Sequence, residues 1–227
     1  MAQRKRHNLR TSIRTKQFRF NYGDGHRIPT MAIQIFHWPD TVPIPTKEPR
    51  TILLQVSGVE RTSEGRRKMR EVLHTVLSGW IGGFVEWLDT DKGPSVRTLI
   101  EGKQVDVSLS YAGGYGWLGI CCGGRIGVDA VVIDESFDSG DIAALYLEAA
   151  DAREIREATD KAAAFAQRWS ALEARCKLAR VPLQEKAPPP NAPVYTTKTT
   201  AKKARIVISV ALQLDIAESE LLAIRRD

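Results

Sequence analysis

Alternation of apolar and polar residues predicts a β-hairpin in the middle of the chain. Residues 105–109 alternate strictly, and residues 115–122 return as a mostly apolar stretch. Gly113 and Gly114, which lie between them, can adopt the positive φ angles that a tight hairpin turn needs. The pattern therefore predicts two antiparallel strands over residues 105–122.

Four shorter apolar runs predict further strands, and proline-rich stretches separate or follow them. Pro39 ends the first run, and residues 187–203 are rich in Pro and Thr without any period, which predicts a loop or flexible linker. A single acid, Asp129, interrupts one of the apolar runs. The predicted strands are residues 31–37, 51–58, 126–133 and 205–214.

Two segments have the period of a helix. The first begins near Ser63, a plausible N-cap, and ends near Gly79. The second covers residues 151–180 and predicts one long helix or two helices in line. In the first segment Arg66, Arg67 and Arg70 lie off an apolar stripe formed by Met69, Val72, Leu73, Val76 and Leu77.

Positive charge is concentrated at the N-terminus. The first nineteen residues carry seven of the 33 Lys and Arg and no acid, which leaves 26 against 27 Asp and Glu in the rest of the chain. Residues 1–29 are therefore expected to form a basic arm. Three interpretations stay open: a mobile tail, extra residues upstream of a start at Met31, or a binding segment for an acidic protein or nucleic acid.

Composition excludes several classes of protein. Apolar residues make up 43% and charged residues 26% of 227, as in globular domains. No run of about eighteen apolar residues predicts a membrane span, and the basic N-terminus lacks the apolar core of a secretory signal, so we expect a cytoplasmic protein without membrane contact. Three cysteines without C-x-x-C spacing and four scattered histidines predict neither a disulfide framework nor a zinc site.

Two acids are the candidates for chemistry. Asp129 lies inside an apolar strand, where a charge is costly unless it is paired or binds a metal; the alternative is a position at the strand end that faces water. Glu173 lies beside the apolar seam of the second helix, with Lys177 one turn later. The alternative for this second pair is an ordinary exposed i, i+4 ion pair.

Together these residues resemble the signature of the 4′-phosphopantetheinyl transferase superfamily, in its surfactin-type branch. Gly-Val-Asp at 127–129 and Trp-Ser-x-x-Glu-Ala-x-x-Lys at 169–177 are similar to the family's G-V-D-x-E strand and W-[ST]-x-K-E-A-x-x-K helix. Residues 107–111 resemble its N-[LI]-S-H-S strand. The resemblance covers residues 105–180 and preserves the order and spacing of all three motifs.

The resemblance implies a magnesium-dependent transfer of 4′-phosphopantetheine from coenzyme A to a serine of an acyl or peptidyl carrier protein. Asp129 and Glu173 would hold the magnesium ion, and Glu173 would also act as general base. Lys177 and Ser110 would contact phosphate oxygens. Cations for the coenzyme's 3′-phosphate are expected from the N-terminal half, at Arg66, Arg67 or Arg70, and Lys92 stands near a position where the family often has a lysine.

Three positions depart from the family pattern. Its second acid falls at Val131, its helix lysine at Leu172 and its strand histidine at Tyr111. Tyr111 can donate one hydrogen bond but carries no positive charge. The pocket is therefore expected to be short of two phosphate-binding cations, unless Lys177, the Arg66–Arg70 helix or Lys92 compensates.

The fold implied by the resemblance is α+β, with two similar halves related by a pseudo-twofold axis and the active site between them. The boundary is expected near residue 110, which gives halves 30–110 and 111–227, and the protein is expected to be a monomer. Two alternatives remain open. One is an impaired relative of the same fold that acts as a binding or accessory protein. The other, a nucleic-acid module that uses the arm, is less favoured because the chain lacks a nucleic-acid motif.

Overall fold

The computed structural model describes most of the chain beyond its N-terminal arm. The residues that it describes are 33–40, 42, 44, 51–81, 86–90, 93–97, 99–100, 102–187, 190–201 and 204–214. The predicted basic arm, residues 1–29, and Lys92 lie outside the described residues.

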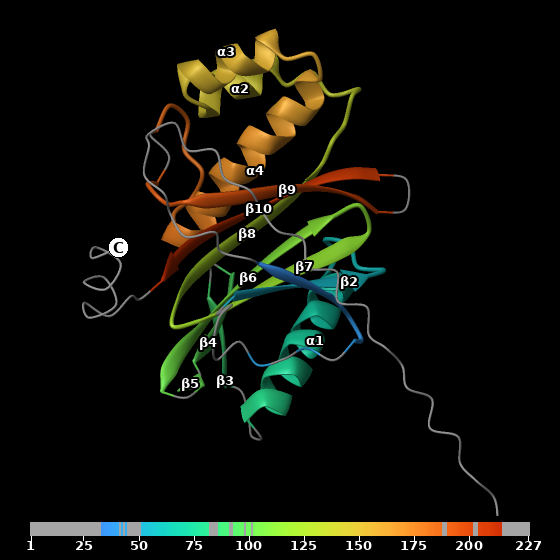
Figure 1. Ribbon diagram of the computed structural model, residues 1–227, viewed down its shortest axis with the longest axis vertical. Coiled ribbons are helices and arrows are strands. Elements are labelled where there is room, and N and C mark those ends of the chain that lie inside the picture. Colours follow the sequence, from blue (N-terminus) through green and yellow to red (C-terminus); the bar gives the residue numbers. More distant parts are fainter. Residues whose placement is uncertain are drawn as a thin grey trace, which may run out of the picture.

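The chain folds as an α+β protein, as the sequence predicts, and its first sheet has the strand order β1-β2-β7-β6-β5 (Figure 1). Helix α1 packs against this sheet through its predicted apolar stripe, which lies in the same buried cluster as the side chains of β2, β6 and β7. A separate hairpin, β3-β4, accompanies the sheet. The elements are β1 (Gln34–His37), β2 (Thr51–Ser57), α1 (Ser63–Ile81), β3 (Glu86–Thr90), β4 (Gly93–Arg97), β5 (Leu99–Ile100), β6 (Lys103–Ala112) and β7 (Tyr115–Cys122).

The second sheet has the order β8-β10-β9, and the remaining described helices lie on one side of it (Figure 1). A mainly apolar cluster fills the space between the two sheets, with Trp117, Val128 and Ile208 among its buried members. On the other face of the second sheet lies α4. The elements are β8 (Gly124–Val132), α2 (Gly140–Tyr146), α3 (Ala149–Glu157), α4 (Lys161–Ala179), β9 (Val194–Ala201) and β10 (Ala204–Leu214).

The predicted hairpin and the four predicted strands are present, with shifted ends. Gly113 and Gly114 both have positive φ angles, 61° and 77°, and form the two-residue turn between β6 and β7. The expected boundary near residue 110 falls within β6. The first sheet also contains β7, which pairs with β2, and the second sheet begins at Gly124.

Helix α1 differs from its prediction at both ends. Thr62, rather than Ser63, caps it, since the Thr62 hydroxyl accepts a hydrogen bond from the Gly65 N–H at 3.1 Å. Gly79 does not end the helix, which continues to Ile81. The apolar stripe does not reveal this extension because it ends before Gly79.

Two further predictions need correction. Residues 194–201, expected to lie within a loop, form the strand β9, since their β-branched Thr and Val side chains suit the edge of a sheet paired to β10. The segment 151–180 contains two helices that are not in line. Arg168 of α4 forms ion pairs with Asp151 and Glu154 of α3, so α3 folds back against α4.

The two sheets meet along β6 and β8 through side chains rather than a backbone ladder. Every second side chain of β6 accepts a hydrogen bond from every second N–H group of β8. These bonds satisfy N–H groups at the edge of β8 that is not paired with β10. The pairs are Asp106 with Ile126, Ser108 with Val128, and Ser110 with Ala130, at 2.8–3.0 Å. A pocket lies at this junction. None of the helices in the described part of the chain has the length and apolar character of a membrane span.

Candidate functional site

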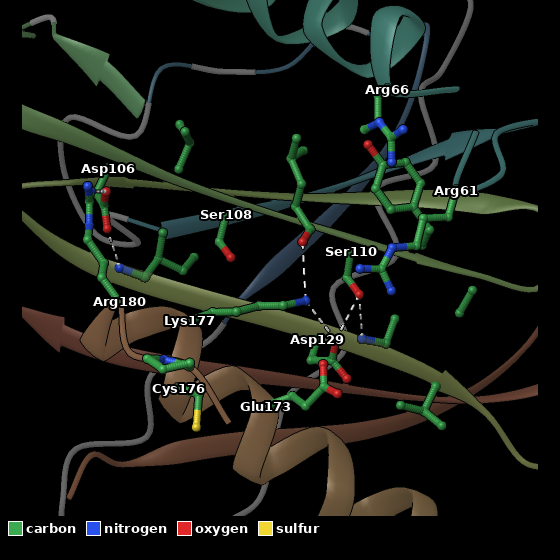
Figure 2. A pocket seen from close by; sticks show the side chains of 18 of the residues that line it. Arg61, Arg66, Asp106, Ser108, Ser110, Asp129, Glu173, Cys176, Lys177 and Arg180 are labelled. Carbon is green, nitrogen blue, oxygen red and sulfur yellow. Dashed lines mark hydrogen bonds and ion pairs between the residues drawn. The ribbon is translucent and has the colours of Figure 1, made fainter. Parts of the chain in front are cut away.

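A pocket of about 860 Å³ lies where the two sheets and two helices meet. One wall comes from β6 and the start of α1, and the other from β8 and the C-terminal half of α4 (Figure 2). Its charged side chains separate into a cationic end near α1, an acidic centre and an ion pair at the far end. They are Arg61, Arg66, Arg70, Asp106, Asp129, Glu173, Lys177 and Arg180.

Asp129 is a buried carboxylate with one unused oxygen. The residue is only 3% exposed. Its Oδ1 accepts hydrogen bonds from the Ser110 hydroxyl at 2.9 Å and from the Lys177 ammonium at 2.7 Å. Its Oδ2 is buried and has no hydrogen-bond partner among the described residues. Because an unsatisfied buried oxygen is costly, this atom is expected to take a partner such as a cation, a water molecule or another hydrogen-bond donor. The possibility that Asp129 faces water at a strand end is therefore wrong.

Glu173 lies beside Asp129 in the same pocket (Figure 2). Burial raises the pKa of the Glu173 carboxyl, and the negative charge of Asp129 raises it further, while Lys177, a hydrogen bond from Trp169 and Arg61 act in the opposite direction. Two neighbouring carboxylates of this kind suit a divalent cation, which removes their repulsion. In the described part of the chain no group of three or more His, Cys, Asp or Glu side chains gathers as a metal site.

Lys177 joins the two walls. Its ammonium donates to Asp129 Oδ1, to the Val128 carbonyl at 3.0 Å and to the Leu109 carbonyl at 3.3 Å. An ammonium has three N–H donors, so all of them are used within the protein. The pairing of Glu173 and Lys177 as an exposed surface pair does not occur, since Lys177 turns toward β6 and β8.

Two uncharged residues of the motifs, Gly127 and Ser170, explain why α4 lies so close to β8. A Cβ atom placed on Gly127 would lie 2.0 Å from the Ala174 carbonyl oxygen and 2.5 Å from the Leu178 nitrogen, so only glycine permits this approach. Ser170, fully buried, bonds to the Ser209 hydroxyl of β10 at 2.7 Å, and Ser209 bonds in turn to Thr196. These contacts hold α4 so that Glu173, Cys176 and Lys177 line the pocket.

Arginines surround Tyr111 at the cationic end. Burial raises the pKa of the Tyr111 phenol, and the charges of Arg66, Arg70 and Arg61 oppose this rise. Arg66 and Arg70 both line the pocket. Arg67 does not line it and instead forms an ion pair with Glu71 on the same helix.

Arg180 and Asp106 form the ion pair at the far end, with 2.8 Å between Arg180 Nη2 and Asp106 Oδ1. Neither residue belongs to the motifs in the sequence. Asp106 has a signal that finds it in retrospect, because it precedes Ser108 and Ser110 at the strand period and so faces the same side of β6. Arg61 and Arg180 have none, since one lies in the loop before α1 and the other just after α4.

The pocket brings together most of the predicted site residues, which are Ser110, Tyr111, Asp129, Glu173, Lys177, Arg66 and Arg70. Val131 lines it as well, where the family has its second acid. Leu172 is buried and is not among the lining residues, so the position of the family's lysine does not open directly onto the pocket.

A second, apolar cavity of about 250 Å³ lies next to the first and shares Val131 and Val132 with it. Its lining is mainly apolar and includes three aromatic rings. Phe165 stacks on Trp169 with ring centroids 5.6 Å apart, and Phe137 lies 5.9 Å from Phe165. The cavity offers a mainly apolar site, with Asp134 and Ser139 as its polar lining residues, beside the charged one.

Comparisons with known proteins add no identification. No protein-family profile matches the sequence, and no curated protein matches it.

Proposed function

We propose that this protein transfers 4′-phosphopantetheine from coenzyme A to a serine of an acyl or peptidyl carrier protein in a magnesium-dependent reaction. One observation carries the proposal: the unpartnered, buried Oδ2 of Asp129 lies beside the Glu173 carboxylate in a pocket with arginines at one end. Acids at the centre and cations at the rim suit a metal–diphosphate ligand.

Asp129 and Glu173 fit a magnesium ion. Magnesium takes one or two carboxylates and completes its shell with phosphate oxygens and water, and Val131 at the third family position does not prevent this. The bound ion would neutralise charge on the diphosphate. Burial first, and then the charge of Asp129, raises the pKa of the Glu173 carboxyl, and a cation between the two acids would offset both effects.

The reaction forms a bond between the carrier serine oxygen and the β-phosphorus, and breaks the bond from that phosphorus to the oxygen of adenosine 3′,5′-bisphosphate. The serine proton would pass to the Glu173 carboxylate, directly or through a bound water. Phosphoryl transfer of this kind depends mainly on positioning and on neutralising charge. Ser110 and Lys177 hold Asp129 in place for it.

The arginines compensate for the two cations that the motif lacks. Arg61, Arg66 and Arg70 would bind the 3′-phosphate, and the Tyr111 hydroxyl would donate to a phosphate oxygen. The neighbouring aromatic cavity would receive the uncharged pantetheine arm, because its lining is mainly apolar and it adjoins the Asp129 strand.

The wider expectations also remain proposals. They comprise two halves related by a pseudo-twofold axis, a cytoplasmic monomer, and an acidic carrier protein attracted by basic segments of the chain.

The transfer activity can be tested directly. The protein is incubated with apo-carrier, coenzyme A and magnesium, and the carrier is weighed by mass spectrometry. A gain of one phosphopantetheinyl group that disappears with a chelator supports the function, and an unchanged carrier at high protein concentration contradicts it.

A second candidate is an impaired relative that binds coenzyme A or a carrier without transfer. It is favoured by the full use of the Lys177 donors within the protein and by the location of Leu172 away from the pocket lining. Calorimetry and the carrier-mass assay together separate the two candidates, because this relative would bind magnesium and coenzyme A in the calorimeter while the carrier mass stays unchanged.

A further inference from the structure

Arg180 ends α4 in an unusual backbone conformation. Its φ and ψ angles are 57° and 37°, and its N–H donates to the Cys176 and Lys177 carbonyls. Residues with a side chain rarely adopt this left-handed conformation, and glycine is the usual choice at this position. An arginine here costs stability, so its side chain is expected to have a role.

The side chain of Arg180 reaches back to β6, where Asp106 receives it. Asp106 uses both of its oxygens: Oδ1 accepts from Arg180 at 2.8 Å, and Oδ2 accepts from the Ile126 N–H at 2.9 Å. One carboxylate therefore connects β6, the beginning of β8 and the end of α4. The Asp106 side chain is only 11% exposed, so water screens the pair weakly on that side.

This connection lies parallel to a second one. Lys177, three residues before Arg180, links the same helix to β6 through the Leu109 carbonyl and to β8 through Asp129. The two cations lie on the side of α4 that faces the pocket (Figure 2).

We propose that Asp106 and Arg180 are positioning residues, which hold the last turn of α4 against β6 and β8 and so keep Glu173 and Lys177 opposite Asp129. The part of this proposal that concerns ligand affinity rests on the proposed function. The part that concerns the position of α4 does not.

Two substitutions and one control in the full-length protein test this proposal. Arg180→Gly removes the side chain but keeps a residue that favours the left-handed cap, so α4 should still end in the same place. Asp106→Asn keeps an acceptor for the Ile126 N–H and removes the charge that Arg180 binds. Lys186→Gly is the matched control, because Lys186 is an exposed residue outside the pocket with a similar φ of 55°.

Two measurements decide the outcome. The first is the labelling rate of the Cys176 thiol, a lining residue of α4 that is 8% exposed, with Cys121 and Cys122, at 0% and 1%, as internal controls for global unfolding. The second is the affinity for Mn²⁺ alone, followed by electron paramagnetic resonance. We expect Arg180→Gly and Asp106→Asn to label Cys176 about fivefold faster through local opening and to bind Mn²⁺ about tenfold more weakly. Lys186→Gly should match the wild type, and the double variant should be no worse than either single one.

Equal Cys176 labelling in the wild type and in Arg180→Gly would overturn the proposal, and so would faster labelling with unchanged Mn²⁺ affinity. If the wild type itself binds neither Mn²⁺ nor coenzyme A, the proposed function fails, while the labelling rates still show whether the pair holds α4. If Asp106→Asn does not fold, Arg180→Gly decides alone.

Discussion

The two walls of the pocket differ in how their charges are held. On the β8–α4 wall, Asp129 is buried, and hydrogen bonds at 2.7 and 2.9 Å hold it to Lys177 of the same wall and to Ser110 of the opposite wall. On the α1 wall, Arg61, Arg66 and Arg70 are exposed. Charges in water are screened and can be exchanged at little cost, whereas a buried charge must be matched by partners. The wall formed by β8 and α4 should therefore decide whether the site exists. The arginines near α1 should decide how tightly the site binds an anion.

The largest effect is expected from Asp129. Asp129→Ala leaves the Lys177 ammonium, which is one-third exposed, without its carboxylate, and should lower the free energy of unfolding by about 2–4 kcal/mol. It should also abolish the magnesium-dependent binding of coenzyme A. Urea unfolding and calorimetry measure the two effects. Asp129→Asn keeps the shape of the side chain and an oxygen that can accept from Lys177, and removes the negative charge.

Asp141→Ala is the control for this change, because Asp141 is an exposed acid in the first turn of α2 and lies outside the pocket. It should leave coenzyme A binding unchanged. Magnesium-dependent binding that survives in both Asp129 variants would show that the buried carboxylate is only a structural partner of Lys177.

Glu173→Gln should have a smaller and opposite effect on stability. The folded-state pKa of the Glu173 carboxyl is raised by burial and by Asp129, so its ionised form destabilises the fold at neutral pH. The carboxyl's stability contribution is full below its ordinary value of 4.5 and is lost as the pH rises through the higher folded-state value. Without metal, the glutamine variant should be more stable than the wild type at pH 7.5, and the difference should shrink toward pH 4.

The transfer reaction should nevertheless be lost in Glu173→Gln, because an amide cannot accept the serine proton. Urea unfolding across the pH range, together with the carrier-mass assay, tests both statements. A glutamine variant less stable than the wild type at pH 7.5 would mean that favourable contacts hold the carboxylate, and the two acids would then not repel each other as described.

The smallest effect is expected on the exposed wall. Arg66→Gln should weaken coenzyme A binding by about threefold to tenfold at low salt, a discounted value for a charge-assisted hydrogen bond in water. The loss should nearly vanish at about 1 M salt, where the Debye length is near 3 Å. Thermal stability should not change, since Arg66 is exposed.

Arg67→Gln is the matched control, one residue along the same helix, exposed and paired with Glu71 away from the pocket. Calorimetry at two salt concentrations compares the variants. Equal losses in Arg66→Gln and Arg67→Gln would reduce the α1 wall to a general electrostatic attraction without a defined phosphate site.

Part of the site was predictable because its signals are local. Asp129 stands out as an acid within an apolar run, and the spacing of Trp169, Glu173 and Lys177 places them on one face of a helix. Their opposition across the pocket was not predictable from the residues alone. It depends on Gly127, which lets α4 approach β8 closely enough for Lys177 to reach Asp129.

By itself the sequence determined the hairpin at Gly113–Gly114, the apolar stripe of α1 and the strands around Asp129, because turn chemistry and periodicity act between residues that are close in the chain. Only the tertiary structure decided that Arg66 faces the pocket while Arg67 does not, and that Arg180 meets Asp106. The latter two are 74 positions apart in the sequence. Their pairing depends on the register of β6 against β8 and on where α4 ends, and no local pattern encodes either of these.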